Sequence, residues 1–233
     1  MKKFAFFDVD YTLYDGYTAI DFHQNLLDTG FIDGSFAGKQ EEIYTQYKAG
    51  EISYTQGSRA ALDLQASTLK GKSIDEVAQV CENFIKAGHK IYPFVAELLI
   101  MLKNAGFTIV FISGSSLPVI QVLGRQLGAD LCFASELDSV DGTYSGTVKR
   151  MMNDEEKSIQ LHSVLEDHSD IYALGFGDTT GDIFMLSEVD KAFVVDPHQE
   201  EMQKTAQEKG WTIVTGDTII DEVKKALASM PTQ

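Results

Sequence analysis

The chain has few cysteines, few prolines and no long hydrophobic run. Its two cysteines, Cys81 and Cys132, lie far apart without C-x-x-C spacing, so they indicate buried thiols and imply neither a disulfide framework nor a zinc site. No apolar run approaches the roughly 20 residues that a membrane-spanning helix needs. The first apolar run is too short for a signal peptide and ends at Asp8 and Asp10. We therefore expect a cytoplasmic protein with no membrane partner.

Positive charge is also scarce. Lysine and arginine together number 19, against 35 aspartates and glutamates, which gives a formal net charge of -16 at pH 7. Such a surface repels a phosphate backbone, so we expect no nucleic-acid partner. An acidic protein that acts on a phosphate ester needs a divalent cation and a lysine at the site itself. A small phosphorylated metabolite therefore fits better than a polymer, and the oligomeric state stays unknown.

The most informative feature that is present is a pair of aspartates after the first predicted strand. The apolar run Phe4–Phe7 leads into Asp8, Val9 and Asp10. Two carboxylates at the buried end of a strand are costly unless they serve a cation or a reaction. The carboxyl ends of parallel strands are also where open α/β folds hold their active sites. An Asx turn after an edge strand is the alternative interpretation of this pattern taken alone.

A second apolar run ends in a cluster of hydroxyl and glycine residues. Residues Phe107–Ile112 lead into the run Ser113–Ser116, which contains Gly114, and Pro118 fits the first turn of a helix that follows. Free backbone N–H groups at the start of a helix suit an anion. This segment therefore predicts an anion-binding position.

A third apolar run delivers two more carboxylates. Residues Ile171–Phe176 are followed by Asp178 and Asp182 before a short helical pattern. Lys157 precedes this strand, in a predicted helix over Asp154–His168, and is the residue that would bring positive charge to the strand ends. A solvated helix lysine is the alternative for Lys157.

These segments, in this order, resemble the motifs of the haloacid dehalogenase superfamily of aspartate-nucleophile hydrolases, in particular its phosphoserine-phosphatase-like branch. The matching elements are Asp-x-Asp-x-Thr over Asp8–Thr12, the serine at Ser113, the lysine at Lys157, and Gly-Asp-x-x-x-Asp at Asp178 and Asp182. Each motif alone is weak, but four in sequence across most of the chain are a strong signal. The resemblance implies an α/β fold with a Rossmann-like parallel sheet core and an inserted helical cap domain of the C1 type.

The resemblance also implies the catalytic and metal-binding residues. Asp8 is the expected nucleophile, which forms an aspartyl-phosphate, and Asp10 is the expected general acid and base. The expected cofactor is Mg²⁺, held by the Asp8 side chain, the Asp10 carbonyl and Asp178. A purely structural carboxylate is the alternative for Asp10. Its presence favours phosphoryl chemistry, because dehalogenases of this superfamily lack the second aspartate.

Other matching residues are implied to bind the phosphate or to support the site. Ser113, the amide of Gly114 and Lys157 are expected to hold the phosphate oxygens. Thr12 and Asp182 are expected to lie behind these groups and to orient them, Asp182 acting on Lys157 or on metal-bound water.

The order of predicted elements divides the chain in two. Strand and helix patterns alternate from about residue 90 onward, as in a parallel sheet with helices on both faces, and a β-hairpin is predicted within residues 135–148. Residues 17–90 read as four helices instead, near 19–28, 35–48, 53–69 and 73–87. We therefore expect a core domain of residues 1–16 and 91–233 and a helical cap domain of residues 17–90. A packing bundle without a gating role is the alternative for the cap.

The predicted function is Mg-dependent hydrolysis of a small organic phosphomonoester. The chain departs from phosphoserine phosphatases in the cap, where Tyr17 replaces a glutamate and Ala61 an arginine, with Arg59 displaced by two positions. A phosphoserine phosphatase and a non-catalytic phosphometabolite-binding protein on the same fold remain alternatives. Phosphomutase chemistry also stays open.

Aromatic residues suggest what the cap recognises. Six of them lie in or next to its predicted helices, and several could face the strand ends. From these we expect a neutral or partly apolar leaving group, with packing of the cap's own core as the alternative. The six are Tyr14, Tyr17, Phe22, Tyr44, Tyr47 and Tyr54.

Overall fold

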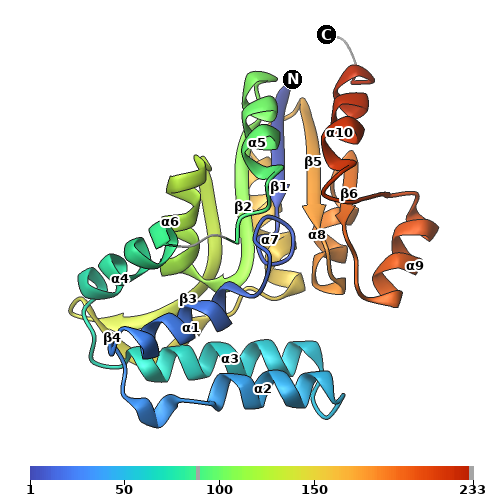
Figure 1. Cartoon of the computed structure of the whole chain (residues 1–233). Coiled ribbons are helices and arrows are strands. Elements are labelled where there is room, and N and C mark those ends of the chain that lie inside the picture. The colour runs from blue at the N-terminus through green and yellow to red at the C-terminus, as the bar shows by residue number, and fades with distance from the viewer. Residues whose placement is uncertain (88–89, 231–233) are drawn as a thin grey trace.

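The computed structural model describes residues 1–87 and 90–230, and Figure 1 shows how their helices and strands are arranged. The strands are β1 (Lys2–Phe7), β2 (Thr108–Ser116), β3 (Leu131–Val140), β4 (Thr143–Arg150), β5 (Ile171–Gly177), β6 (Lys191–Val195) and β7 (Thr212–Val214). The first four helices are α1 (Thr18–Asp28), α2 (Lys39–Lys48), α3 (Tyr54–Leu69) and α4 (Ile74–Ala87). The later helices are α5 (Val95–Asn104), α6 (Leu117–Leu127), α7 (Asp154–Leu165), α8 (Ile183–Ser187), α9 (Glu200–Lys209) and α10 (Ile219–Ala228). Short 3₁₀ turns, η1 (Gly34–Phe36) and η2 (Thr180–Asp182), precede α2 and α8.

The seven strands form one sheet in the order β4-β3-β2-β1-β5-β6-β7. All neighbouring pairs are parallel except β3 and β4, which form the predicted antiparallel hairpin. In the sheet, β1 lies between β2 and β5, and the three strands run parallel. The segments that follow them therefore meet at one edge of the sheet. The α/β class with a mostly parallel sheet, predicted from the sequence, is confirmed.

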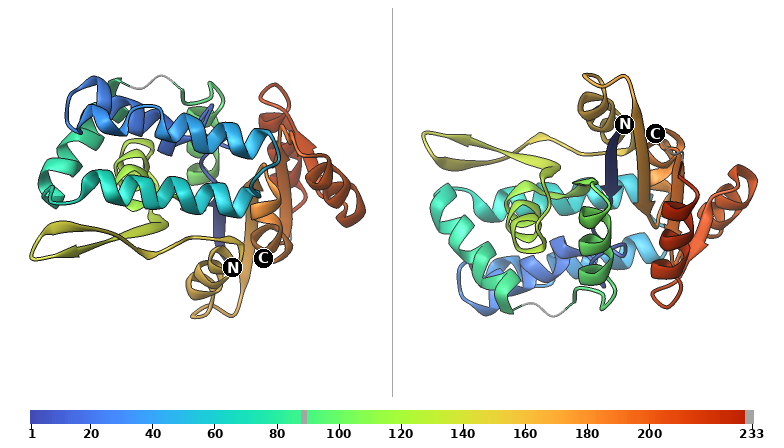
Figure 2. Two further views of the ribbon diagram at one scale, coloured as in Figure 1. Left: turned by 90° about the horizontal axis from the view of Figure 1, so that it is seen from below. Right: turned by 90° about the horizontal axis from the view of Figure 1, so that it is seen from above.

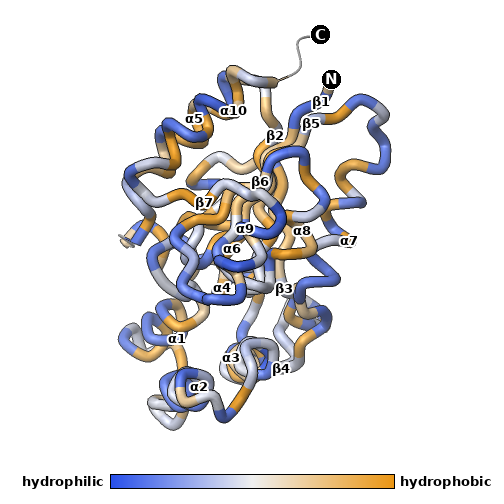
Figure 3. The backbone as a smooth tube through the Cα atoms, turned by 90° about the vertical axis from the view of Figure 1, so that its right-hand side faces the viewer, coloured by the Kyte–Doolittle hydropathy of each residue, from blue (hydrophilic) through white to orange (hydrophobic). Residues whose placement is uncertain are grey.

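The sheet is buried on both faces, as its near-continuous apolar strands require. One face packs Phe7, Phe111, Phe176 and their neighbours against helices that include α5, α6 and α10. The other face packs Phe6 and its neighbours against residues of α7, α8 and α9. Figure 3 shows the hydrophobic residues concentrated along the sheet strands between these layers. This core holds the strand ends at a fixed spacing, which a site built on them requires.

Helices α1 to α4 follow β1 and depart from the alternating pattern, at the place where the sequence predicts helices. Figure 1 shows α1, α2 and α3 crossing beyond the carboxyl ends of the strands. Seen from below in Figure 2, α2 and α3 run side by side and the β3–β4 hairpin lies along α3. Helix α4 packs next to α6, at the side of the sheet. We call residues 18–87 the helical insertion.

Local signals explain the helix boundaries in the insertion. Ser53 and Gln56 form a reciprocal capping box at the start of α3. Ser73 and Glu76 exchange the same two hydrogen bonds before α4, as the sequence predicts. The single helix predicted over 35–48 is wrong: Gly38, with φ 77°, separates η1 from α2.

One other predicted boundary differs from the structure. The helix expected to reach His168 ends at Leu165, with Glu166 as its C-terminal cap residue.

Within the described residues, no helix has the length and apolar character that crossing a membrane would take.

Candidate active site

Two aspartates meet at the carboxyl ends of β1 and β5. The two strands pair in parallel up to Phe7 and Phe176, and the Asp8 N–H extends the ladder by donating to the Phe176 carbonyl at 2.9 Å. The next residues of the β5 segment bring Asp178 to the same edge. Both carboxylates are buried, and together with Asp182 they offer oxygen atoms that lie within 4.8 Å of one another.

Lys157 lies between two of these carboxylates. Its Nζ donates to Asp8 Oδ1 and to Asp182 Oδ1, each at 2.6 Å, and the residue is only 6% exposed. The side chain of Asn153 caps α7 and so fixes the first turn of that helix. This holds the backbone from which the Lys157 side chain extends. Burial lowers the pKa of Lys157, but the attraction of Asp182 and Asp8 outweighs it and holds that pKa well above 10.5. The lysine is therefore a permanent cation inside the site.

Asp182 joins the lysine to the loop after β5. Its second oxygen, Oδ2, accepts the backbone N–H groups of Asp178 and Thr179, both at 3.1 Å. Gly177 permits this close approach, because a Cβ at that position would lie 2.7 Å from the Asp182 side chain. With both oxygens engaged, Asp182 is placed to orient Lys157 and the loop.

Asp8 and Asp178 each keep one oxygen that accepts no hydrogen bond from the described residues. Asp8 Oδ1 takes the lysine, and Asp178 Oδ1 accepts the Thr12 hydroxyl at 3.2 Å. Burial raises the pKa of Asp8 to about 7, and burial together with the charges of Asp182 and Asp8 raises that of Asp178 well above its usual value. Burial and mutual repulsion disfavour the negative charge on these two carboxylates, and a hard divalent cation between them would compensate that charge.

Asp10 is held by groups that sequence reasoning missed. Its Oδ1 accepts the N–H of Thr18 at 2.9 Å, at the start of α1, and its Oδ2 accepts the hydroxyl of Ser115 at 2.9 Å. The Thr18 and Ser115 hydroxyls are themselves 2.6 Å apart. Burial raises the pKa of Asp10. The extra serine in the Ser113–Ser116 run was the sequence signal for this contact.

The predicted phosphate-binding segment lies at the end of β2. The Ser113 hydroxyl is buried and accepts the N–H of Ser115 at 3.2 Å. Gly114 lines the pocket over the strand ends, and its carbonyl accepts the hydroxyl of Ser135 at 2.7 Å. Ser113, Thr12 and Asp182 do not line that pocket, whereas Asp8, Asp10, Lys157 and Asp178 do.

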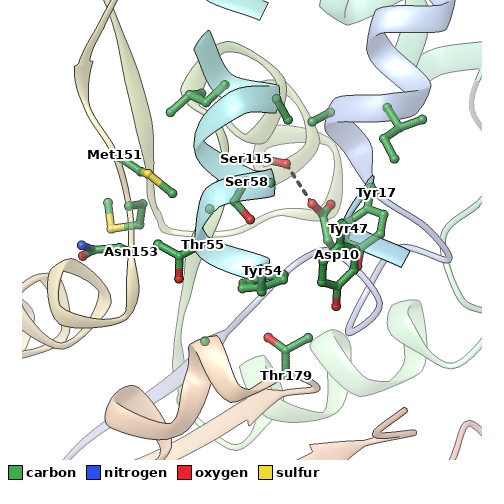
Figure 4. Close-up of a pocket in the computed structure, with 18 of the residues that line it drawn as sticks. Asp10, Tyr17, Tyr47, Tyr54, Thr55, Ser58, Ser115, Met151, Asn153 and Thr179 are labelled. Atoms are coloured by element: carbon green, nitrogen blue, oxygen red, sulfur yellow. Dashed lines mark hydrogen bonds between the residues drawn. The ribbon is translucent and has the colours of Figure 1, made fainter. Parts of the chain in front are cut away.

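The pocket extends from the strand ends to the helical insertion. Figure 4 shows Tyr17, Tyr47 and Asp10 on one side, Met151 and Asn153 on the other, and α3 between them. Four of the six aromatic residues predicted to matter line it, namely Tyr17, Tyr44, Tyr47 and Tyr54. Tyr14 donates to Asp21 and Phe22 packs on Phe84 in the core instead. Four of the six therefore lie where they could contact a substrate, and the kind of leaving group that they recognise stays a prediction.

The two departures from the phosphoserine pattern both face this pocket. Tyr17 and Ala61 are among its lining residues. Arg59, the displaced arginine, is exposed and pairs with Asp63 one turn on, at 2.8 Å. In the described part of the chain, Lys157 is the one lysine or arginine that lines the pocket.

Comparison with known proteins gives a family match. The model of the haloacid dehalogenase-like hydrolases matches residues 5–187, which include every residue of the site described above.

Individual relatives are more distant. Phosphoserine phosphatase SerB1 of Mycobacterium tuberculosis is 26% identical over 218 residues, covering 90% of this chain and 69% of the relative. A protein named histidinol-phosphatase from Neisseria meningitidis is 25% identical over 226 residues, covering 92% and 99%. Among solved structures, a protein of unknown function from Bordetella pertussis Tohama I has a TM-score of 0.76 at 20% identity, with 92% and 98% covered. A phospho-aspartyl intermediate analogue of phosphoserine phosphatase has a TM-score of 0.64 at 22% identity, with 92% and 93% covered.

Proposed function

This chain belongs to the haloacid dehalogenase-like hydrolase family, and from that membership we propose that it is a magnesium-dependent phosphatase of a small organic phosphomonoester. The observation that supports this most is the buried group of Asp8, Asp178 and Asp182 around the Lys157 ammonium. Relatives named as phosphatases of two different substrates support the reaction class. A cytoplasmic location is part of the proposal and rests on the sequence alone.

Asp8 is the nucleophile in this proposal. Lys157 holds one of its oxygens, which leaves the other to attack phosphorus in line. A bond from phosphorus to the Asp8 oxygen forms as the bond to the substrate's ester oxygen breaks, which gives an aspartyl-phosphate. Water then attacks this intermediate and releases inorganic phosphate, so one difficult displacement becomes two easier ones.

Asp10 is the proposed general acid and base. Its pKa is raised by burial, which favours a protonated carboxyl that can give its proton to the departing alkoxide. The resulting carboxylate then takes a proton from the water that cleaves the aspartyl-phosphate. Such proton transfers contribute about 10² to 10⁴ in rate.

The phosphate oxygens are proposed to bind three groups. Lys157 supplies positive charge, and the Ser113 hydroxyl and Gly114 N–H supply hydrogen bonds. Thr12 and Asp182 support them, because Thr12 donates to Asp178 and Asp182 holds Lys157.

A magnesium ion fits the remaining donors. The Asp8 oxygen that does not attack phosphorus, the free oxygen of Asp178 and the main-chain carbonyl of Asp10 would hold it, and that carbonyl accepts no hydrogen bond within residues 1–87 and 90–230. The bound cation would cancel repulsion between the Asp8 carboxylate and the phosphate dianion.

Residues 17–90 are proposed to act as a cap domain over a core of residues 1–16 and 91–233. The arrangement that supports this is the passage of α1 to α3 across the strand ends, with pocket walls from all three helices. The cap would set which leaving group the site accepts. Helix α4 lies on α6, so the moving part, if the cap opens, is expected to be α1 to α3.

A second candidate is hydrolysis of histidinol phosphate, the activity named for the Neisseria relative. It is favoured over phosphoserine hydrolysis because the pocket offers no free arginine or lysine for an amino acid's carboxylate among the described residues. Turnover measurements separate both from a protein that binds a phosphorylated metabolite without hydrolysing it.

The test is turnover of p-nitrophenyl phosphate by the purified protein with Mg²⁺ and with excess chelator. We expect activity that requires the metal, and a loss of at least about 10⁴-fold in Asp8→Asn, because removing a nucleophile from a site that acts as a unit is this costly. The matched control is Asp63→Asn, an exposed aspartate on α3. Full activity in chelator, or in Asp8→Asn, would overturn the mechanism, and phosphate binding without turnover would favour a non-catalytic binding protein.

A further inference from the structure

The pocket between the strand ends and the helical insertion is lined by more acidic than basic side chains. Its lining includes Asp154, at the first turn of α7, and this carboxylate has no ion-pair partner within residues 1–87 and 90–230. Lys157 is already shared between Asp8 and Asp182. Lys48 approaches the ring of Tyr44, 5.4 Å from its centroid, but does not line the pocket. Asp154 therefore brings to the pocket wall a negative charge that no described residue pairs with.

Asp154, Thr179 and Tyr54 converge on the backbone of Gly181. A methyl group built on Gly181 would be 3.4 Å from Tyr54 Cε1, 3.4 Å from the Thr179 hydroxyl and 3.8 Å from Asp154 Oδ1. A carboxylate, a hydroxyl and an aromatic ring that converge on one part of the pocket wall, where Gly181 adds no side chain of its own, are groups that attract an ammonium ion. The same groups repel a carboxylate.

The four pocket tyrosines add to this preference. Tyr17 and Tyr44 meet edge to face with ring centroids 6.1 Å apart, and Tyr47 and Tyr54 do so at 6.0 Å. Aromatic rings in this number suit a cationic nitrogen as well as an apolar group. No arginine stands among them in the described chain.

Gln65 shows that the pocket wall also needs a polar ligand atom. It lines the pocket from α3, is 2% exposed, and neither its Oε1 nor its Nε2 has a hydrogen-bond partner among residues 1–87 and 90–230. Leaving a buried amide unsatisfied is costly, so a bound molecule with polar atoms on its leaving group would relieve the cost.

We infer that the leaving group of the substrate carries a positively charged nitrogen close to the phosphate ester and no carboxylate, as in 2-aminoethyl phosphates. This inference rests on the proposed phosphatase activity. Asp154 lies one helical turn before Lys157, so an ammonium at Asp154 and a phosphate at Lys157 are only a few bonds apart. The sequence alone predicts a neutral leaving group, and the unpaired Asp154 changes that expectation.

Four phosphomonoesters test the inference, because all four share the ethyl phosphate skeleton and differ only in the groups on its second carbon. Phosphoethanolamine adds an amine to ethyl phosphate, phosphoserine adds a carboxylate to phosphoethanolamine, and histidinol phosphate adds an imidazolylmethyl group at the same carbon. We expect kcat/KM for phosphoethanolamine to exceed that for ethyl phosphate and for phosphoserine by about tenfold each, the size of one partly buried charge contact. Histidinol phosphate should equal or exceed phosphoethanolamine, since its ring can reach further polar atoms.

Asp154→Asn should reduce the ratio of phosphoethanolamine to ethyl phosphate kcat/KM to about one. The matched control is Glu155→Gln, which removes the same charge from the next residue of α7, exposed and outside the pocket, and should leave the ratio unchanged. Ethyl phosphate or phosphoserine as good as phosphoethanolamine, or an unchanged ratio in Asp154→Asn, overturns the inference. No turnover of any ester, p-nitrophenyl phosphate included, overturns the proposed function instead.

Discussion

The strand-end site and the pocket wall above it are built in opposite ways. At the strand ends, the Lys157 ammonium pairs with both Asp8 and Asp182, and both oxygens of Asp182 have partners, so these three side chains form a closed network of ion pairs. In the wall, Gln65 has no partner and the tyrosine hydroxyls that line the pocket form no hydrogen bond to described residues. A fully paired network keeps its geometry without a ligand, whereas unpaired groups await one. The difference separates the part that performs the reaction from the part that selects the substrate.

The largest expected effect on folding comes from opening the closed network. Lys157→Met leaves Asp8 and Asp182 buried without their counter-ion, which typically costs about 3–5 kcal/mol of unfolding free energy. The matched control, Arg59→Met, breaks an exposed pair with Asp63 and should cost at most about 1 kcal/mol. Urea unfolding in chelator measures both. Equal stability of Lys157→Met and wild type would show that the network is not closed in solution.

A metal-dependent shift in stability should come next in size. Without a cation, the raised pKa of Asp8, about 7, means that the folded protein holds a proton that the unfolded chain loses near pH 4. The contribution of Asp8 to the free energy of unfolding is therefore complete below about pH 4 and is lost as the pH rises to about 7. The raised pKa values of Asp10 and Asp178 act in the same direction.

Mg²⁺ should reverse this loss because it binds the ionised carboxylates. A ligand at a concentration of about 100 times its dissociation constant adds about 2.7 kcal/mol to the free energy of unfolding. For a chain of this length, that raises the Tm by about 5 °C or more. The rise should be larger at pH 7.5 than at pH 5, and Asp178→Asn should remove it. An equal rise in Asp178→Asn would place the metal elsewhere.

The strand-end site was predictable because its signal is local. Asp8, Asp10, Asp178 and Asp182 each follow an apolar strand within a few residues, and the parallel topology brings strand ends together without further information. The family and the α/β fold predicted from those motifs are confirmed. The roles assigned to the individual residues stay predictions.

The pocket wall was less predictable because its residues come from separate helices. Which tyrosines face the cavity depends on how α1, α2 and α3 rotate against each other, and Tyr14 and Phe22 turned into the core instead. Asp154 looked like an ordinary acidic residue of a helix's first turn. Its position beside Gly181 follows from tertiary packing alone.

The smallest expected effect lies where the two regions join. Asp10 belongs to the strand-end site, but Ser115 and the first residue of α1, Thr18, orient its carboxyl group.

Ser115→Ala removes one of these contacts without touching a proposed metal or phosphate ligand. We expect about a tenfold loss of kcat on ethyl phosphate, whose alkoxide needs a proton to leave, because misplacing a general acid forfeits part of its 10² to 10⁴ contribution. On p-nitrophenyl phosphate, whose nitrophenolate leaves unprotonated, the loss should be below about threefold. Ser116→Ala is the matched control, since that neighbouring hydroxyl is buried and has no hydrogen-bond partner in the described part of the chain, and it should leave both rates unchanged. If Ser115→Ala slowed both esters equally, Ser115 would support the fold of the β2 end and not the proton transfer by Asp10, and the link between the helical insertion and the acid would lose its basis.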